Sequence, residues 1–107
     1  MSARVRSHVV ELGGIQPALL ADTGALAAAL IAAAGAVGLA TEGPPAVLRS
    51  ADGVAVALVC RDGHLVMHTG PEAGVCLVDV AAREPRPVEL GMEIIARRLG
   101  VAVPAQG

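Results

Sequence analysis

Side chains that could take part in chemistry gather in the middle of this sequence. His64 and His68 lie four residues apart among apolar residues, and Glu72 follows a Gly-Pro pair. Asp79 lies in the next apolar run. Imidazole and carboxylate groups of this kind can move protons or bind polar ligands. On a strand, residues four apart are separated by about 13 Å, so the two histidines cannot share one metal ion.

Motifs for other kinds of catalysis are missing. The serines at positions 2, 7 and 50 lie in no Gly-x-Ser-x-Gly motif, and no glycine loop of the phosphate-binding kind is present. Cysteine or histidine pairs with the spacing of a zinc site are absent as well, so we expect no metal. Cys60 and Cys76 are the only cysteines, and without an export signal we expect reduced thiols in the core of a cytoplasmic protein.

The composition limits the partners of this chain. The 107 residues suit a single domain, residues 1–107. Hydrophobic residues make up 54%, yet there is no Phe, Trp or Tyr, so no ring can stack on an adenine or attract a sulfonium. The net charge is -2 and the eight basic residues, all arginine, form no stripe, so a nucleic acid partner is not expected. The longest apolar stretch, residues 25–40, is alanine-rich and contains two glycines, so we expect no membrane span.

The first third of the chain predicts a strand and a helix. Residues 8–12 are valine-rich and end at two glycines, as a short strand would. Pro17 suits the first turn of a helix that ends near Gly38. Its start stays open, because Asp22-Thr23-Gly24 weakens the first turns. One apolar face of this helix is formed by Leu19, Leu26, Leu30 and Val37.

The middle of the chain predicts four short strands, residues 46–49, 54–60, 64–69 and 74–80. Turn residues separate them, among them two Asp-Gly pairs, Asp52-Gly53 and Asp62-Gly63. An Asp-Gly pair between apolar runs favours a hairpin with a type I′ turn, which requires positive φ. We therefore expect an antiparallel meander, with Gly63 at positive φ.

A second helix is predicted over residues 88–99, with an apolar stripe and a stop at Gly100. Residues 101–103 suit a last short strand. The order β-α-β-β-β-β-α predicts an α+β two-layer sandwich, an antiparallel sheet with two helices on one face. The other face of the sheet then needs cover, and a partner chain packed sheet-on-sheet or edge-on-edge would supply it.

The segment 62–72, Asp-Gly-His-Leu-Val-Met-His-Thr-Gly-Pro-Glu, resembles the processing-site segment of the prokaryotic S-adenosylmethionine decarboxylases, Glu-Ser-His-Leu-x-x-His-Thr-Trp-Pro-Glu. The flanking runs 7–12 and 74–80 look like the first strand of that family and the strand after the processing site. The resemblance covers approximately residues 7–100. It implies the same fold, an S-adenosylmethionine decarboxylase-like α+β sandwich.

The resemblance places Gly63 at the position of the self-cleaving serine. In that family the Glu-Ser bond breaks through an N→O acyl shift, and the serine becomes a pyruvoyl group that forms a Schiff base with the substrate. This chemistry requires a side-chain hydroxyl, and Gly63 has none. Its neighbours Asp62 and His64 supply no hydroxyl either. The resemblance therefore implies a member of the family without pyruvoyl-dependent decarboxylation, and no cofactor is expected.

Other family positions have changed too. The two aromatic residues of the adenine-stacking slot correspond to Gly70 and Arg49, and a serine that assists the reaction corresponds to Ala55. The catalytic cysteine corresponds to Arg83, which we expect to be solvated, like Arg86, unless it faces the pocket and binds an anion.

Four residues that match family site positions are retained. His68 corresponds to a histidine that assists processing and is the remaining catalytic candidate. Glu72 corresponds to the residue that holds the ribose hydroxyls. Glu11 and Asp79 are further ligand-binding candidates. His64 is expected to be structural.

Three functions follow from these features. The first is a non-processing S-adenosylmethionine decarboxylase homologue in polyamine (spermidine) or S-adenosylmethionine metabolism, a pseudoenzyme that forms a homodimer or a heterodimer with an active chain. The second is an enzyme of altered, pyruvoyl-independent chemistry on S-adenosylmethionine or a related small molecule. The third is a ligand-binding or structural relic.

Overall fold

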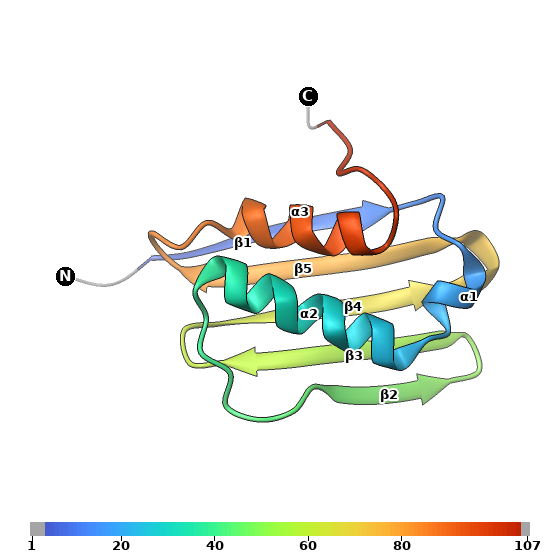
Figure 1. Cartoon of the computed structure of the whole chain (residues 1–107), viewed down its shortest axis with the longest axis horizontal. Helices are drawn as coiled ribbons and strands as arrows, with labels where there is room; N and C mark the ends of the chain where they lie inside the picture. Colours follow the sequence, from blue (N-terminus) through green and yellow to red (C-terminus); the bar gives the residue numbers. More distant parts are fainter. Residues whose placement is uncertain (1–3, 106–107) are drawn as a thin grey trace.

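The computed structural model describes residues 4–105, which form one antiparallel sheet and a layer of helices. The elements follow in the order β1 (Val5–Leu12), α1 (Pro17–Leu20), α2 (Thr23–Val37), β2 (Ala46–Ser50), β3 (Gly53–Cys60), β4 (Gly63–Gly70), the 3-10 turn η1 (Pro71–Ala73), β5 (Val75–Arg83) and α3 (Val88–Arg98). The strand order is β1-β5-β4-β3-β2, so β2 to β5 form the predicted meander. The α+β two-layer sandwich is confirmed (Figure 1).

The core lies between the sheet and the two long helices. Helix α2 buries Leu26, Leu30 and Val37, three members of its predicted apolar face. Helix α3 packs close to α2 because Gly91 has no side chain: a Cβ at that position would lie 2.7 Å from Val37 Cγ2. Every residue of the core is aliphatic, methionine, cysteine or alanine.

The first helical segment is broken in two. Asp22 accepts a hydrogen bond from Ala25 N at 3.0 Å and thereby caps the N-terminus of α2. This cap separates the short helix α1 from α2. The break lies at Asp22-Thr23-Gly24, the stretch for which the sequence did not decide where the helix begins. The helix therefore begins at Thr23, six residues after Pro17.

The hairpin turns differ from the predicted type. Ser50 pairs with Gly53, and Cys60 pairs with Gly63, so each turn consists of the two residues before the glycine. A type I′ turn would require positive φ at both turn residues. Among residues 4–105 the residues with positive φ are all glycines, and Gly63 is not one of them. The prediction of a type I′ turn with positive φ at Gly63 was wrong.

The predicted strand at residues 101–103 was also wrong. Gly100 has φ 77° and ends α3, and Val101 N donates to Ala96 O, which turns the chain back over the helix. The segment then leads away from both α3 and the sheet (Figure 1). Val101 and Val103 contact the core without joining a strand.

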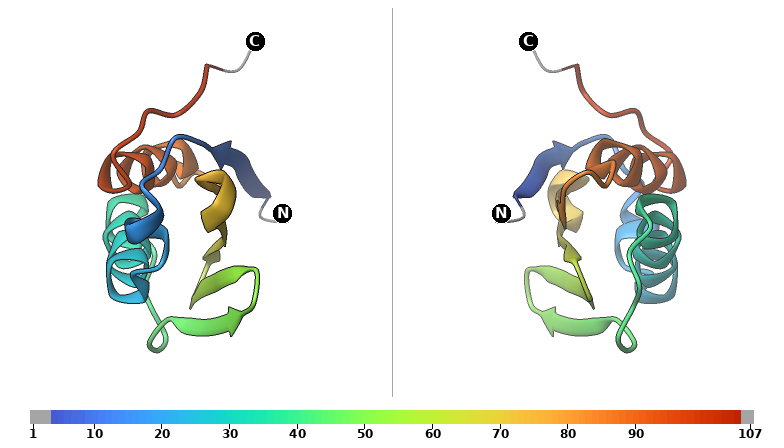
Figure 2. Two further views of the ribbon diagram at one scale, coloured as in Figure 1. Left: turned by 90° about the vertical axis from the view of Figure 1, so that its right-hand side faces the viewer. Right: turned by 90° about the vertical axis from the view of Figure 1, so that its left-hand side faces the viewer.

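All helices of residues 4–105 lie on one side of the curved sheet, and no element of these residues covers the other side (Figure 2). We call this uncovered side the open face. Its most exposed apolar residues are Val5, Val9, Leu48, Val59 and Leu77. In the described residues, no helix has the length and apolarity needed to cross a membrane.

Candidate functional site

Strand β4 carries or adjoins most of the predicted site residues, and it spreads them over three places. Gly63 begins the strand, and Glu72 lies in η1 just beyond its other end. His64 and His68 lie between these ends on the open face, because Leu65 and Met67 alternate with them and are buried on the helix side. Gly63 and Gly70 are about 23 Å apart at 3.3 Å per residue. One chain therefore does not unite these groups in a single pocket.

Close approach of strand β5 explains why residue 63 is a glycine. Gly63 pairs with Ala82. A Cβ on Gly63 would overlap the carbonyl oxygen of Ala81 and would lie 2.9 Å from Ala82 Cα. Both obstacles are backbone atoms, which cannot turn aside as a side chain can. The space that a serine side chain needs at this position is thus occupied by the neighbouring strand.

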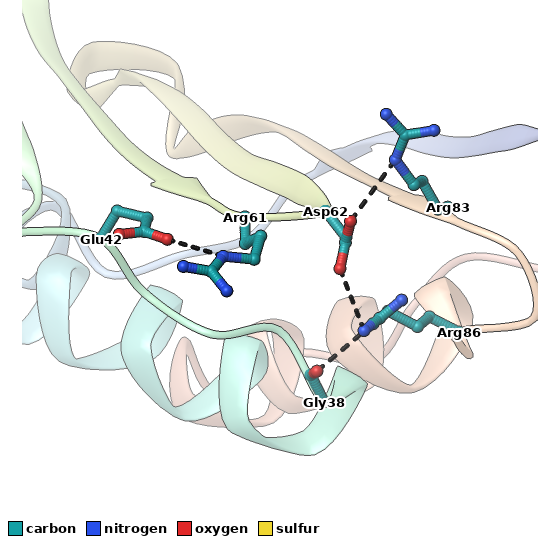
Figure 3. A network of polar contacts seen from close by, with 6 residues as sticks. All are labelled: Gly38, Glu42, Arg61, Asp62, Arg83 and Arg86. Carbon is teal, nitrogen blue, oxygen red and sulfur yellow. Dashed lines mark hydrogen bonds and ion pairs between the residues drawn. The ribbon is translucent and has the colours of Figure 1, made fainter. Parts of the chain in front are cut away.

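Ion pairs hold the same end of the sheet. The Asp62 carboxylate lies between two guanidinium groups, 3.4 Å from Arg83 Nε and 3.3 Å from Arg86 Nη2 (Figure 3). Arg86 Nε also donates to Gly38 O at 3.3 Å, at the end of α2. Along the backbone, Arg83 N donates to Asp62 O at 2.9 Å. The turn before Gly63 is therefore tied both to β5 and to the helix layer.

These contacts add to the expectation for the two arginines, which was that both are solvated, with Arg83 a candidate for binding an anion. The Arg83 side chain is 52% exposed and that of Arg86 is 32% exposed, so both reach solvent. Their charges are also shared with Asp62, so an anion would have to compete with a carboxylate already in place. Arg61 pairs separately with Glu42 at 3.0 Å on the adjacent surface (Figure 3).

Asp79 lies on the open face with valines as its cross-strand neighbours. It pairs in register with Val9 on one side and Val66 on the other. Its Oδ2 lies 3.4 Å from His64 Nε2, while its Oδ1 is buried and has no hydrogen-bond partner among residues 4–105. A buried carboxylate oxygen without a donor is costly. A donor from a covering molecule would satisfy it.

His68 and Glu11 lie in one cross-strand row of the open face, separated by Leu77. Two strand spacings place them about 10 Å apart. On its other side His68 pairs with Ala55, and the two residues line a shallow cavity of about 190 Å³ together with Leu48. The structure therefore places His68 and Glu11 in one row of this face, while Glu72 lines a different cavity.

Glu72 lines a larger cavity at the other end of β4. This cavity, which we call the Glu72 cavity, has a volume of about 490 Å³. Its lining also includes Arg49, Asp52 and Gly70. Positions 49, 70 and 72, which the family resemblance assigned to the adenine and ribose slot, thus meet around one cavity. Its walls are charged and aliphatic instead of aromatic.

Several of these features were missed in the sequence. Asp52 and Asp62 looked like ordinary turn residues, and nothing marked Asp62 as the partner of two arginines far along the chain. The contact between His64 and Asp79 depends on the β4–β5 register, in which Val66 lies opposite Asp79. The signal available for Asp79 was its charge within an otherwise apolar strand.

Both cysteines are buried, as predicted, and their thiols are free. Burial raises the pKa of the Cys76 thiol to about 12 and raises that of Cys60 as well. At pH 9 the folded protein should hold roughly 500-fold less Cys76 thiolate than the unfolded chain, so iodoacetamide should label it far more slowly. The same shift stabilises the fold below pH 9, and that stabilisation declines as the pH rises toward 12.

Peptide mass spectrometry of native and urea-unfolded samples checks this prediction. Cys76 should become labelled in urea and remain unlabelled in the native sample. Equal labelling in both samples would contradict the burial.

Among residues 4–105 no three His, Cys, Asp or Glu side chains are grouped so that they could hold a metal ion.

Comparisons with known proteins point to one family. The sequence model of the family described as S-adenosylmethionine decarboxylase matches residues 6–104. The fold is similar to that of the crystal structure of the adenosylmethionine decarboxylase from Aquifex aeolicus, with a TM-score of 0.81, 17% sequence identity, and coverage of 94% of this chain and 84% of that one. No curated protein sequence matches.

Proposed function

Because this chain belongs to the S-adenosylmethionine decarboxylase family, we propose that it is a non-processing member, a pseudoenzyme of S-adenosylmethionine or polyamine (spermidine) metabolism that pairs with a second chain. The observation that supports the absence of processing is at Gly63. This residue lacks the hydroxyl that an acyl shift requires, and the Ala81 carbonyl fills the place of its Cβ. The residues around it fit no pyruvoyl group.

The surroundings of Gly63 support the same proposal. Arg83, at the position that the resemblance assigns to the catalytic cysteine, is paired with Asp62. Ala55, at the position of the assisting serine, has a methyl group where a hydroxyl would be needed. His68 alone retains a proton-carrying group of the processing machinery, and a base without a nucleophile cannot start the reaction.

The open face supports a partner chain. It exposes large aliphatic side chains on β1, β2, β3 and β5, and no element of residues 4–105 covers them. A sheet face of this kind is commonly covered by a second chain. It also carries Asp79 Oδ1, which is buried without a donor. A second sheet packed on this face would bury the aliphatic residues and could donate to Asp79. Cytoplasmic assembly with a copy of itself or with an active chain follows as part of the proposal.

An antiparallel pairing would also bring the separated site residues together. Within one chain, the Gly63 end and the Glu72 end of β4 lie about 23 Å apart. If two chains pack with their β4 strands running in opposite directions, the Glu72 end of each approaches the Gly63 end of the other. A heterodimer of this kind would place His68 or Glu72 of this chain beside a pyruvoyl group on an active partner.

The mass of the intact protein after expression tests the non-processing proposal. We expect one species with the mass of the unbroken chain. Two fragments that divide between Asp62 and Gly63 would overturn it. Incubation for several days at 37 °C should leave the single species unchanged, because cleavage is prevented by the missing nucleophile and is not merely slow.

Co-expression with an active decarboxylase chain of the same family tests the partner role. We expect the two chains to purify together and the decarboxylation rate per active chain to rise. The active chain expressed alone is the control. Absence of physical association, both with that chain and between copies of this one, would contradict the proposal.

The Glu72 cavity favours a second function, the binding of a small molecule without catalysis. Its volume lies within the range of small-molecule sites. Altered catalysis has less support, because His68 and Glu72 line different cavities and Asp79 lines neither.

A further inference from the structure

Two ionisable side chains of the open face are in contact with each other. His64 Nε2 lies 3.4 Å from Asp79 Oδ2, diagonally across the pairing of β4 with β5. Both side chains reach solvent in the single chain, where 45% of His64 and 36% of Asp79 is exposed. Oδ1 of Asp79 is already buried and has no hydrogen-bond partner among residues 4–105. Any molecule that covers this face must therefore also cover the charge of Asp79.

The other neighbours of His64 provide no free charge. Its neighbours in the rows and along the strand are uncharged, namely Val59 on β3, Ala81 on β5, Ser7 on β1 and Val66 on β4 itself. The charged residues at this end of β3 and β5 are already in ion pairs, Arg61 with Glu42 and Arg83 with Asp62. Asp79 is thus the counter-charge available to a protonated His64.

The remaining ionisable groups of the open face lie farther along the strands. His68 is four residues from His64 on the same strand, which corresponds to about 13 Å. Glu11 lies in the row of His68. Neither of them forms an ion pair with any of residues 4–105. The contact of His64 with Asp79 is therefore the place on this face where a proton decides between a neutral pair and a net charge.

A second sheet packed on the open face would remove water from this contact. A charge that is buried without a counter-charge is strongly unfavourable. With a neutral imidazole, each chain would bury the carboxylate of Asp79 uncompensated. With an imidazolium, the two charges cancel and the covered pair is neutral. A two-fold dimer contains the pair twice, so its formation should take up two protons.

We infer that pairing of two copies of this chain across the open face is proton-dependent, with His64 and Asp79 as the switch. Protonation of His64 favours the dimer, and the dimer weakens as the pH rises through the range in which histidine loses its charge, roughly pH 5 to 8. This inference rests on the pairing proposed above and names its regulation. It does not depend on the absence of processing.

Sedimentation equilibrium of the full chain at pH 6, 7 and 8, at constant ionic strength, tests the inference. The dissociation constant of the dimer should rise at least about a hundredfold from pH 6 to pH 8, because dissociation releases two protons and the limiting slope is two decades per pH unit. Far-ultraviolet circular dichroism at each pH verifies that the chain stays folded. A dissociation constant that is constant or falls as the pH rises would overturn the inference.

Two variants locate the switch. His64→Gln retains a hydrogen-bond donor beside Asp79 but cannot become charged. Its dissociation constant should not vary with pH and should be close to the value of the unmodified chain at pH 8. Asp79→Asn removes the charge that covering would bury. It should abolish the rise with pH and tighten the dimer at pH 8 at least about tenfold.

The two other histidines of the chain provide matched controls. His8 pairs with the buried Val80 and thus lies on the helix side of the sheet, so His8→Gln should retain both the affinity and its pH dependence. His68→Gln alters the open face itself, and its readout is the slope with pH, which should remain. Loss of the slope in either control, or a full slope in His64→Gln, would refute the assignment to His64.

The same measurements separate this inference from the proposed function. A dimer whose dissociation constant does not depend on pH would leave the pairing intact and show that the switch is wrong. A monomer at every pH and concentration would contradict both the pairing of copies and the switch. The mass of the intact chain tests the absence of processing independently of either.

Discussion

Replacing Gly63 by serine should destabilise the protein without making it cleave itself. The new Cβ would meet the Ala81 carbonyl oxygen and Ala82 Cα, so β4 and β5 must separate locally to admit it. Inserting side-chain volume against fixed backbone costs about 1–3 kcal/mol. The hydroxyl would also lack help, because Arg83 and Ala55 replace the groups that the family resemblance assigns to the reaction. Urea unfolding and intact mass measure the two effects.

Gly13→Ser is the matched control for this experiment. A Cβ on Gly13 meets nothing within 4 Å, so the same change should alter the free energy of unfolding by no more than about 0.5 kcal/mol. If Gly63→Ser were as stable as Gly13→Ser, the packing argument would fail. If it divided into two fragments at residues 62 and 63, the loss of processing would rest on the hydroxyl alone.

Replacing Leu77 by lysine should abolish pairing. Leu77 lies between Glu11 and His68 on the open face and is 44% exposed in the single chain. Burying a charge at a packed interface costs about 2 kcal/mol or more. A two-fold dimer contains the substitution twice, so its dissociation constant should rise about a thousandfold. Sedimentation with interference optics suits a chain without tryptophan or tyrosine.

Leu90→Lys is the control for Leu77→Lys. Leu90 is 40% exposed, nearly the same as Leu77, but it lies on helix α3, in the layer on the opposite side of the sheet. Its substitution should leave the dimer, or the complex with an active chain, intact. Dissociation by both variants would mean that the open face is not the interface. A monomer at every concentration, together with failure to bind an active chain, would remove the basis for pairing.

The elements of the fold could be predicted because their signals are local. Alternating apolar residues, glycine stops and proline breaks marked every long element, and the apolar stripe of α3 is buried as expected. The errors arose where two signals compete. Asp62-Gly63 has the composition of a type I′ turn, but the pairing of Cys60 with Gly63 makes Arg61 and Asp62 the turn residues. The pattern of residues 101–103 favoured a strand, although the turn at Gly100 directs them away from the sheet.

The site could be predicted only in part, because its geometry depends on register. His64 and His68 share a face by strand alternation, which the sequence predicts. The contact of His64 with Asp79 depends on the register between β4 and β5, which the length of η1 sets, and the sequence did not predict that length. The sequence also did not predict the ion pairs of Arg83 and Arg86 with Asp62, which join residues about twenty positions apart. The grouping of Arg49 with Glu72 depends on the register of β2, β3 and β4, which brings the end of β2 beside the turn after β4.

Strand β1 pairs with β5 along its length, and the paired residues lie 64 to 78 positions apart in the chain. The other strands join neighbours through short connections, two of which are two-residue turns. The entropic cost of closing a loop rises with its length, so we expect the meander to form first and β1 to be added last. On the ribosome the order of appearance is reversed, because β1 is made first and its partner near the end. The first strand synthesised must therefore wait, unpaired, for almost the whole of translation.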